Sequence, residues 1–89
     1  MSWHVYIVRC ADDSLYTGIA LDVARRVAEH NGDQRALGAR YTRGRRPVRL
    51  VYQEAVASRS LAARREAQIK RLSRTAKERL ADQAASIDR

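Results

Sequence analysis

Eighty-nine residues suffice for one domain and leave no room for a second core, and a chain this short buries roughly 60–65% of its unfolded surface. Hydrophobic residues make up 45% of the chain, which argues against disorder. Eighteen Lys and Arg against ten Asp and Glu give a net charge of +8, which predicts a polyanionic partner, most simply nucleic acid.

The single cysteine, Cys10, excludes an intrachain disulfide and favours a reducing compartment. The N-terminal residues contain no charged segment followed by an apolar core, so we expect no signal peptide. The longest apolar run is far shorter than the ~20 residues that cross a membrane. We therefore expect a cytoplasmic protein without a membrane partner.

The N-terminal third begins with two predicted strands. Residues Trp3 to Cys10 are rich in β-branched and aromatic side chains over a length too short for a helix. Ala11 to Ser14 are typical turn residues, and Leu15 to Gly18 then form a second, antiparallel strand. Whether Tyr6 and Tyr16 share one face of this hairpin depends on its register, which the sequence leaves open.

A helix is predicted next, ending near Asn31-Gly32, which is a typical stop signal. Asp22 lies near its start, where a negative charge favours the helix dipole. Asp22, Arg26 and His30 recur at four-residue intervals and so lie along one edge of the helix. The buried stripe is expected to consist of Ala20, Val23, Ala24, Val27 and Ala28.

Asn31 to Pro47 form a long connection without a clear period, which is typical of a functional loop. The segment contains a single acidic residue, Asp33, and five arginines, which are Arg35, Arg40, Arg43, Arg45 and Arg46. These arginines either solubilise the surface or follow a phosphate backbone, with Tyr41 stacking on a base.

The C-terminal half is predicted to contain one strand and two helices. The strand is Val48 to Val56, and the first helix is capped by Ser58 or Ser60 and ends at about Leu72. The residues Thr75 to Glu78 match a capping box, so the last helix should start there. The apolar stripe expected for this last helix is Ala76, Leu80, Ala84 and Ile87.

These elements predict an α+β fold with the order β-β-α-β-α-α. A three-stranded antiparallel sheet flanked by helices buries all of the apolar stripes. We expect a single domain over residues 1–89, with a core from about 3 to 85.

Glu66 interrupts an otherwise apolar face that is expected to contain Ala62 and Ile69 and to extend to Leu72 or Ser73. An inward carboxylate is costly unless something pairs with it. The partner is either one of the 18 cations or a hard divalent ion such as Mg²⁺, with waters and substrate phosphate completing its shell.

Four further side chains have two interpretations each. Tyr6 and Tyr16 are either half-buried aromatics of the sheet or include a catalytic base. The second interpretation requires a nearby metal or arginine that lowers the pKa of the phenol. Arg26 and His30 either face solvent or face a phosphate. In the second case Arg26 stabilises charge and His30 orients water or moves a proton.

Taken together, the residues resemble the GIY-YIG nuclease superfamily. The first triplet of the motif is His4-Val5-Tyr6 and the second is Tyr16-Thr17-Gly18. Arg26, His30 and the glutamate of the segment RREAQIKRL follow at matching positions. The resemblance covers nearly the whole chain. It extends to small stand-alone bacterial proteins with a YTRGRRPVRLVY-like stretch and to the catalytic domain of the nucleotide-excision-repair endonuclease.

The resemblance implies roles for the residues of the two triplets. Tyr6 corresponds to the tyrosine proposed as general base for the attacking water. Tyr16 corresponds to the second tyrosine, which positions phosphate or water. Gly18 matches the glycine that leaves room in the cleft. His4 replaces the first glycine of the motif, and we interpret this change as a tolerated substitution in a strand.

The resemblance also implies roles for three later residues. Arg26 would contact the scissile phosphate, and His30 occupies a position where related nucleases keep a histidine or a tyrosine. Glu66 would bind a single Mg²⁺ or Mn²⁺, which acts as a Lewis acid and stabilises the leaving oxygen. Lys70, one turn after Glu66, either assists on the same edge or is solvated.

The leading hypothesis is therefore a metal-dependent endonuclease that acts on DNA, in repair, recombination or nucleic-acid turnover, without a small-molecule cofactor. The alternative is a nucleic-acid-binding module of the same fold with weak or no catalysis. A third interpretation, an adaptor that docks on an acidic protein, requires only the positive charge.

Overall fold

The computed structural model describes residues 2–32 and 40–87, without the side chains of residue 40 and residues 85–87. Three antiparallel strands form one sheet in the order β2-β1-β3. They are β1 (Trp3–Arg9), β2 (Leu15–Ala20) and β3 (Arg49–Val56). The predicted α+β fold with a three-stranded antiparallel sheet is thus confirmed.

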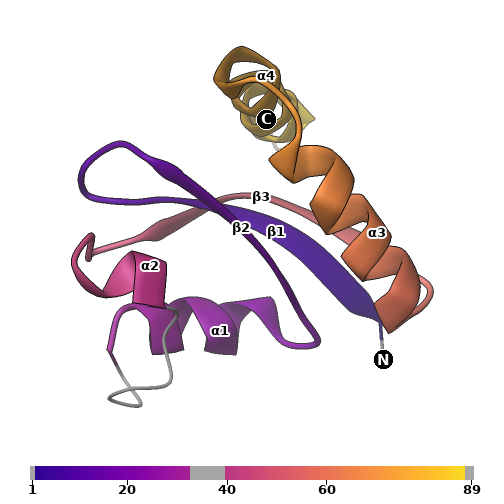
Figure 1. The fold of residues 1–89 in the computed structure, drawn as a ribbon, viewed down its shortest axis with the longest axis horizontal. Coiled ribbons are helices and arrows are strands. Elements are labelled where there is room, and N and C mark those ends of the chain that lie inside the picture. The colour runs from indigo at the N-terminus through magenta and orange to yellow at the C-terminus, as the bar shows by residue number, and fades with distance from the viewer. Residues whose placement is uncertain (1, 33–39, 88–89) are drawn as a thin grey trace.

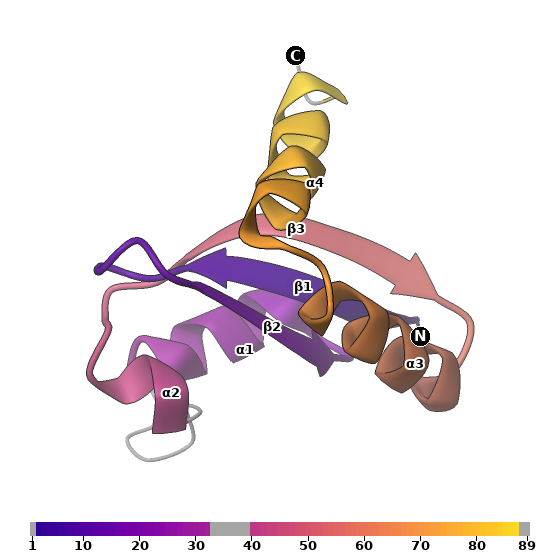
Figure 2. The same ribbon diagram turned by 45° about the horizontal axis from the view of Figure 1, so that its top comes forward.

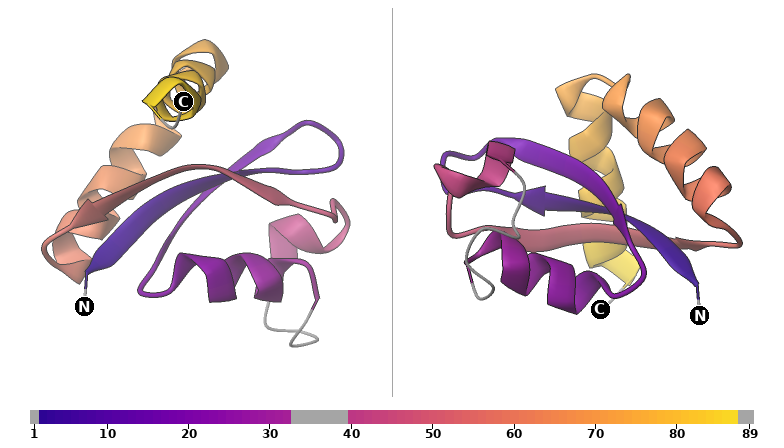
Figure 3. Two further views of the ribbon diagram at one scale, coloured as in Figure 1. Left: turned by 180° about the vertical axis from the view of Figure 1, so that it is seen from behind. Right: turned by 60° about the horizontal axis from the view of Figure 1, so that its bottom comes forward.

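Helices cover both faces of the sheet. Figure 1 shows α1 (Val23–His30) and α2 (Arg40–Arg43) on one side, and α3 (Arg59–Lys70) and α4 (Arg74–Ile87) on the other. The two views of Figure 3 show the same division. Among the described residues, every helix is too short or too polar to cross a lipid bilayer.

The central strand β1 contributes to a core on each side, because successive side chains of a strand point to opposite faces. Tyr6 and Val8 pack toward α1 with Val23, whereas Val5 and Ile7 pack toward α3 and α4. The residues of α3 and α4 in this second cluster are Ala62, Ile69 and Leu80.

The prediction is wrong in two places. Ala20 ends β2 instead of starting the helix, and its side chain is buried from the strand. The helix α1 therefore begins at Val23, with Asp22 as its N-cap. The connection from 31 to 47 contains the short helix α2, which has no hydrophobic period because it is only one turn long.

The start of α4 also differs from the prediction. The hydroxyl of Ser73, not that of Thr75, accepts a hydrogen bond from the amide of Ala76 and caps the helix. Glu78 is not available for a capping box because it binds the guanidinium groups of Arg9 and Arg74. Figure 2 shows the result, with α4 standing above β3.

The inward stripe of α3 is shorter than predicted. Ala62 and Ile69 are fully buried, but Leu72 and Ser73 lie beyond the end of the helix at Lys70 and are exposed. In α4 the predicted residues Leu80 and Ala84 are half-buried. The side chain of Ile87 lies outside the described residues.

The N-cap of α1 provides a test of the fold near the candidate site. The amide of Arg25 donates to Oδ1 of Asp22 at 3.0 Å. We expect Asp22→Ala to lower the free energy of unfolding by about 1 kcal/mol, because an amide at the helix start loses its acceptor. Urea denaturation measures this change. Asp22→Asn keeps an acceptor and should stay close to the wild type, and equal losses in both variants would contradict the assignment.

Candidate active site

The register of the β1–β2 hairpin places the two motif tyrosines on one face. Tyr6 pairs with Gly18, and Val8 pairs with Tyr16. Residues two apart in a strand point the same way, so Tyr6 and Tyr16 both face α1. The sequence left this point open, and the structure resolves it in favour of a shared face.

Gly18 is required by the ring of Tyr6, which crosses the space that a side chain would fill. A Cβ atom built on Gly18 would lie 2.6 Å from the hydroxyl oxygen of Tyr6 and 2.7 Å from its Cζ. Tyr6 is only 1% exposed, so its ring has little freedom to move aside. The glycine of the motif is therefore explained by the packing of the tyrosine.

His30, at the C-terminal end of α1, is fully buried. Its Nε2 lies 2.7 Å from the Tyr6 hydroxyl and its Nδ1 lies 2.9 Å from Oγ1 of Thr42. Thr42 belongs to α2 and is also fully buried. The interpretation of His30 as a solvent-facing residue is wrong, because the segment that contains α2 closes over the end of α1.

Arg26 lies one turn before His30 and is 29% exposed. Its guanidinium donates to Glu29 at 2.9 Å. It is also close enough to the Tyr6 hydroxyl for a hydrogen bond and for electrostatic attraction, and both oppose the rise in the pKa of Tyr6. Arg26 thus connects the buried phenol with the surface.

Aromatic rings extend this group toward α2. The ring centroids of Tyr16 and His30 lie 5.3 Å apart in an edge-on arrangement, and those of Tyr16 and Tyr41 lie 5.7 Å apart in a stack. The guanidinium of Arg45 lies 4.0 Å from the centroid of the Tyr41 ring. Tyr41 therefore packs between Tyr16 and Arg45, although it remains 39% exposed.

Tyr6 and His30 are both neutral near pH 7. Burial, together with the nearby Tyr16, raises the pKa of Tyr6 to about 12 despite the opposing charge of Arg26. Burial, with the positive charges of Arg26 and Arg46, lowers the pKa of His30 to about 4. In the protein without metal or substrate, the lowering effect of Arg26 on the pKa of Tyr6 is therefore smaller than the raising effect of burial.

Glu66 approaches the same group from α3. Its side chain is 24% exposed and lies 3.4 Å from the ammonium of Lys70, so the ion pair that the sequence offered as one of two interpretations of Glu66 is present, with Lys70 as the partner. The negative charge of Glu66 contributes to the raised pKa of Tyr6, which puts this carboxylate within electrostatic reach of the phenol. Glu66 is the member of the group that comes from the helix layer on the opposite side of the sheet.

A single carboxylate fits one kind of metal site. The described residues contain no group of three or more His, Cys, Asp and Glu side chains that could hold an ion. An oxygen donor such as Glu66 suits Mg²⁺ or Mn²⁺, and Mg²⁺ commonly keeps several waters and takes further ligands from substrate phosphates. The donor chemistry of Glu66 is therefore compatible with a weakly held divalent ion that binds together with a phosphate.

The predicted arginine-rich surface divides into two kinds of residue. Arg45 pairs with Asp12 at 3.0 Å, and Arg46 donates to the carbonyl oxygen of His30 at 2.7 Å, so both hold the segment against the fold. Arg43 is exposed. The side chain of Arg40 and the whole of Arg35 lie outside the described residues.

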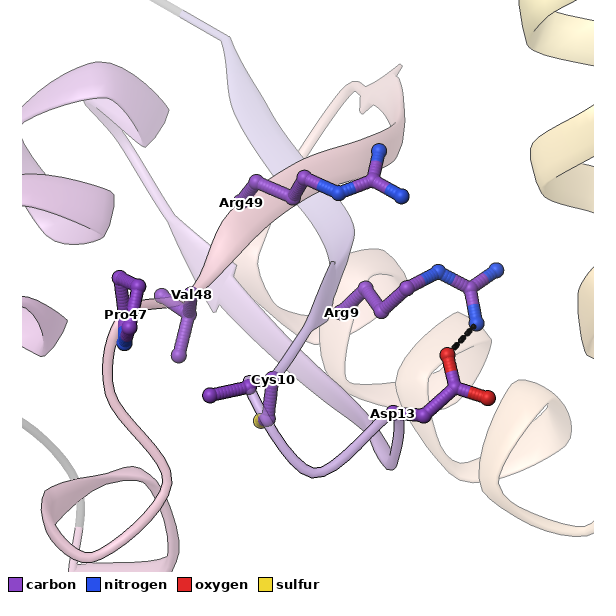
Figure 4. A pocket seen from close by; sticks show the side chains of 7 residues that line it. Arg9, Cys10, Asp13, Pro47, Val48 and Arg49 are labelled. Atoms are coloured by element: carbon purple, nitrogen blue, oxygen red, sulfur yellow. Dashed lines mark hydrogen bonds and ion pairs between the residues drawn. The ribbon is translucent and has the colours of Figure 1, made fainter.

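Two other features bear on the site. His4, which replaces the first motif glycine, pairs with Ala20 on one side and Ala55 on the other, and its Nδ1 is buried without a hydrogen-bond partner among the described residues. A hollow of about 330 Å³ lies at the C-terminal end of β1 and is lined partly by Arg9, Cys10 and Arg49 (Figure 4). It contains none of the five predicted catalytic residues.

Sequence reasoning missed Thr42, which binds the histidine directly. The only signal was its position in the YTRGRRPVRLVY stretch, immediately after Tyr41. A threonine in a polar segment is ordinarily exposed, so its burial could not be inferred without the packing of α2.

The close approach of Gly18 and Tyr6 predicts a loss of stability on substitution. We expect Gly18→Ala to lower the free energy of unfolding by about 1–3 kcal/mol, because the buried phenol must move. Denaturation with urea measures the change. Gly44→Ala is the matched control, since a Cβ there meets nothing within 4 Å. Equal effects of the two substitutions would show that the ring of Tyr6 does not fill this space.

The environment of His30 predicts a pH dependence of stability. Between pH 6.5 and about 4 the unfolded chain binds a proton on this residue that the folded chain does not. The contribution of His30 to the free energy of unfolding should therefore be fully present above pH 6.5 and fall by about 2–3 kcal/mol as the pH falls to 4. Urea denaturation at several pH values tests this. His30→Gln should flatten the dependence, and an unchanged slope would contradict the buried neutral imidazole.

Comparison with known proteins identifies the family of this chain. A family model for the GIY-YIG catalytic domain matches residues 2–79. A UPF0213 protein of Desulfotalea psychrophila is 58% identical over 79 residues, which cover 89% of this chain and 70% of that protein. A UPF0213 protein of Haloquadratum walsbyi is 51% identical over 85 residues, covering 96% and 92%. The relatives are thus archaeal as well as bacterial.

Two solution NMR structures are also similar. The UPF0213 protein BH0048 from Bacillus halodurans has 46% identity and a TM-score of 0.56, with 92% of this chain and 84% of that chain covered. The protein EF2693 from E. faecalis has 37% identity and a TM-score of 0.61, with 96% and 88% covered. By its sequence over nearly all of its length, this chain belongs to the GIY-YIG catalytic domain family, whose members are typically nucleases.

Proposed function

We propose that this protein is a metal-dependent endonuclease that hydrolyses phosphodiester bonds in DNA, in repair, recombination or nucleic-acid turnover. The main support is the grouping of Tyr16, Arg26 and Glu66 within electrostatic reach of Tyr6, in a chain with a net charge of +8. A polyanion that approaches this surface meets hydrogen-bond donors and one carboxylate, which is a combination suited to phosphoryl chemistry.

The proposed site has a buried layer and an exposed layer. Tyr6 and His30 form the buried layer. Arg26, Glu66 and Tyr16 are half-exposed and form the layer that a phosphate would contact. The guanidinium of Arg26 would donate to the phosphate and stabilise its developing charge, and the hydroxyl of Tyr16 would position the phosphate or the attacking water.

Glu66 would hold a single Mg²⁺ or Mn²⁺. Such an ion, when bound, lowers the pKa of nearby water and stabilises the leaving oxygen. Lys70 would have to release the Glu66 carboxylate and, being 53% exposed, could then turn toward a phosphate. The weak ion pair at 3.4 Å is compatible with such an exchange, because exposed pairs contribute little free energy.

Tyr6 is the proposed general base. Its high pKa means that it is protonated near pH 7, so it can accept a proton from water only after it has lost its own proton, which additional positive charge near its oxygen would favour. A divalent ion held at Glu66 would add that positive charge. Because the phenol is only 1% exposed, Arg26, which a bound phosphate would attract, would have to shift for water to reach it.

The basic segment adjoins the site directly. Tyr41 stacks on Tyr16, so a nucleic-acid strand contacting Arg43 or Arg45 would lie beside the proposed catalytic residues. A base would have to displace Arg45 to stack on Tyr41. The full set of proposed nucleic-acid contacts remains Gly18, Arg35, Arg40, Tyr41, Arg43, Arg45, Arg46 and Lys70.

A cleavage assay tests the proposal. We expect the wild type to cut at least one of single-stranded, duplex or branched DNA with Mg²⁺ or Mn²⁺. Glu66→Gln should abolish cleavage while DNA affinity and folding persist, and Tyr6→Phe should slow cleavage by about 10²–10⁴-fold, as expected when a general base is lost. Single-turnover rates and fluorescence anisotropy provide the two readouts.

The matched control is Glu54→Gln, which removes a carboxylate that is also half-buried and ion-paired, in this case to Arg65 at 2.8 Å. It should keep wild-type cleavage. Salt-sensitive binding without metal-dependent turnover on any substrate would favour the binding module instead. Cleavage by Glu66→Gln at the wild-type rate would overturn the proposed metal ligand.

A further inference from the structure

The partners of His30 determine where its single proton lies. A neutral imidazole has one donor and one acceptor nitrogen, and here each nitrogen has one hydroxyl within hydrogen-bond distance: Tyr6 at Nε2 and Thr42 at Nδ1. Both hydroxyls could in principle donate or accept. The donor-to-acceptor direction of these two hydrogen bonds must therefore be set by a neighbouring group that can only donate.

Arg26 is that group. The guanidinium lies within hydrogen-bonding reach of the Tyr6 hydroxyl, and because it has no acceptor the phenolic oxygen can only accept from it. The phenolic proton then needs an acceptor of its own. Because Tyr6 is buried and Nε2 of His30 lies 2.7 Å away, that nitrogen is the acceptor at hand.

We infer that Thr42 is a positioning residue of this site: its hydroxyl accepts the Nδ1 proton of His30 and so keeps Nε2 bare and directed at the Tyr6 hydroxyl. The chain runs from Arg26 through Tyr6 and His30 to Thr42. The opposite tautomer would direct two donors at the Tyr6 oxygen and leave the phenolic proton without this acceptor, which is costly in a buried place.

The orientation has a consequence for the proposed function, on which this part of the inference rests. The phenolic proton points toward His30, away from the side on which a phosphate would approach. The Tyr6 oxygen keeps one lone pair beyond the one that Arg26 can use, and a water molecule could use that lone pair once a shift of Arg26 opened the 1% exposed phenol to solvent. Thr42 would thus prepare Tyr6 as an acceptor without touching the substrate.

Thr42 also links this chain to the basic segment. It follows Tyr41, which stacks on Tyr16, and it precedes the exposed Arg43. A strand of nucleic acid that moved α2 would change the partner of Nδ1. The segment is therefore a wall of the site as well as a binding surface.

NMR of the imidazole nitrogens in the full chain near pH 7 tests the inference. The wild type should have its proton on Nδ1 of His30, and Thr42→Ser, which keeps a hydroxyl, should preserve this state. Thr42→Val has the same shape without the hydroxyl and should shift the population toward the Nε2–H form. Thr17→Val, which loses a buried hydroxyl on the other face of the sheet, is the matched control and should leave the imidazole unchanged.

Cleavage kinetics give the second readout. Loss of the positioning hydroxyl in Thr42→Val should lower kcat by about 10-fold or more with little change in KM, with rescue in Thr42→Ser. Wild-type protein with its proton on Nε2, or an unchanged tautomer in Thr42→Val, would overturn the inference. The NMR result does not depend on turnover, so an inactive wild type would defeat the proposed function while the tautomer assignment is judged separately.

Discussion

The hydrogen bond of 2.7 Å between the Tyr6 hydroxyl and Nε2 of His30 constrains the rest of the site. It joins the central strand to the end of α1, and both side chains are at most 1% exposed. An unpaired polar group in such a place costs about 1–3 kcal/mol, so strand and helix must keep this spacing. Gly18 follows from the same constraint, because the phenol that reaches His30 passes over the backbone of β2.

Around this bond, the charged groups are arranged by depth. The phenol and the imidazole are buried and neutral, whereas Arg26 and Glu66 lie at the surface with ion-pair partners in Glu29 and Lys70. Each surface charge is held by a neighbour that a phosphate or a divalent ion could replace. The resting protein thus satisfies its polar groups internally, and the proposed chemistry requires exchange of those partners rather than rearrangement of the fold.

Sequence periodicity was sufficient to predict helices that bury an apolar stripe over several turns and strands whose buried and exposed side chains alternate. The strands β1 and β3 and the helix α3 were predicted within two residues of their bounds. Periodicity failed at Ala20, which is apolar in either a strand or a helix and so fits both patterns. It also failed for α2, which is a single turn and has no period to detect.

The site was predictable only in part, for physical reasons. Spacing along one helix placed Arg26 and His30 on a common edge, but burial of His30 depends on α2, which is remote in sequence. The shared face of Tyr6 and Tyr16 depends on hairpin register, which the turn residues alone do not fix. The ion pair of Arg45 with Asp12 joins two connections, and pairings between loops leave no pattern in a single sequence.

The central claim is that the Glu66 carboxylate and the Tyr6 phenol face one site for a divalent ion. Substoichiometric Mn²⁺ added to isotopically labelled protein tests it most directly, through paramagnetic broadening of NMR signals. We predict the strongest broadening at Glu66, Tyr6 and Tyr16, with weaker effects toward the C-terminal end of α4, and its loss in Glu66→Gln. Broadening centred on other carboxylates, or equal broadening in Glu66→Gln, would contradict the account.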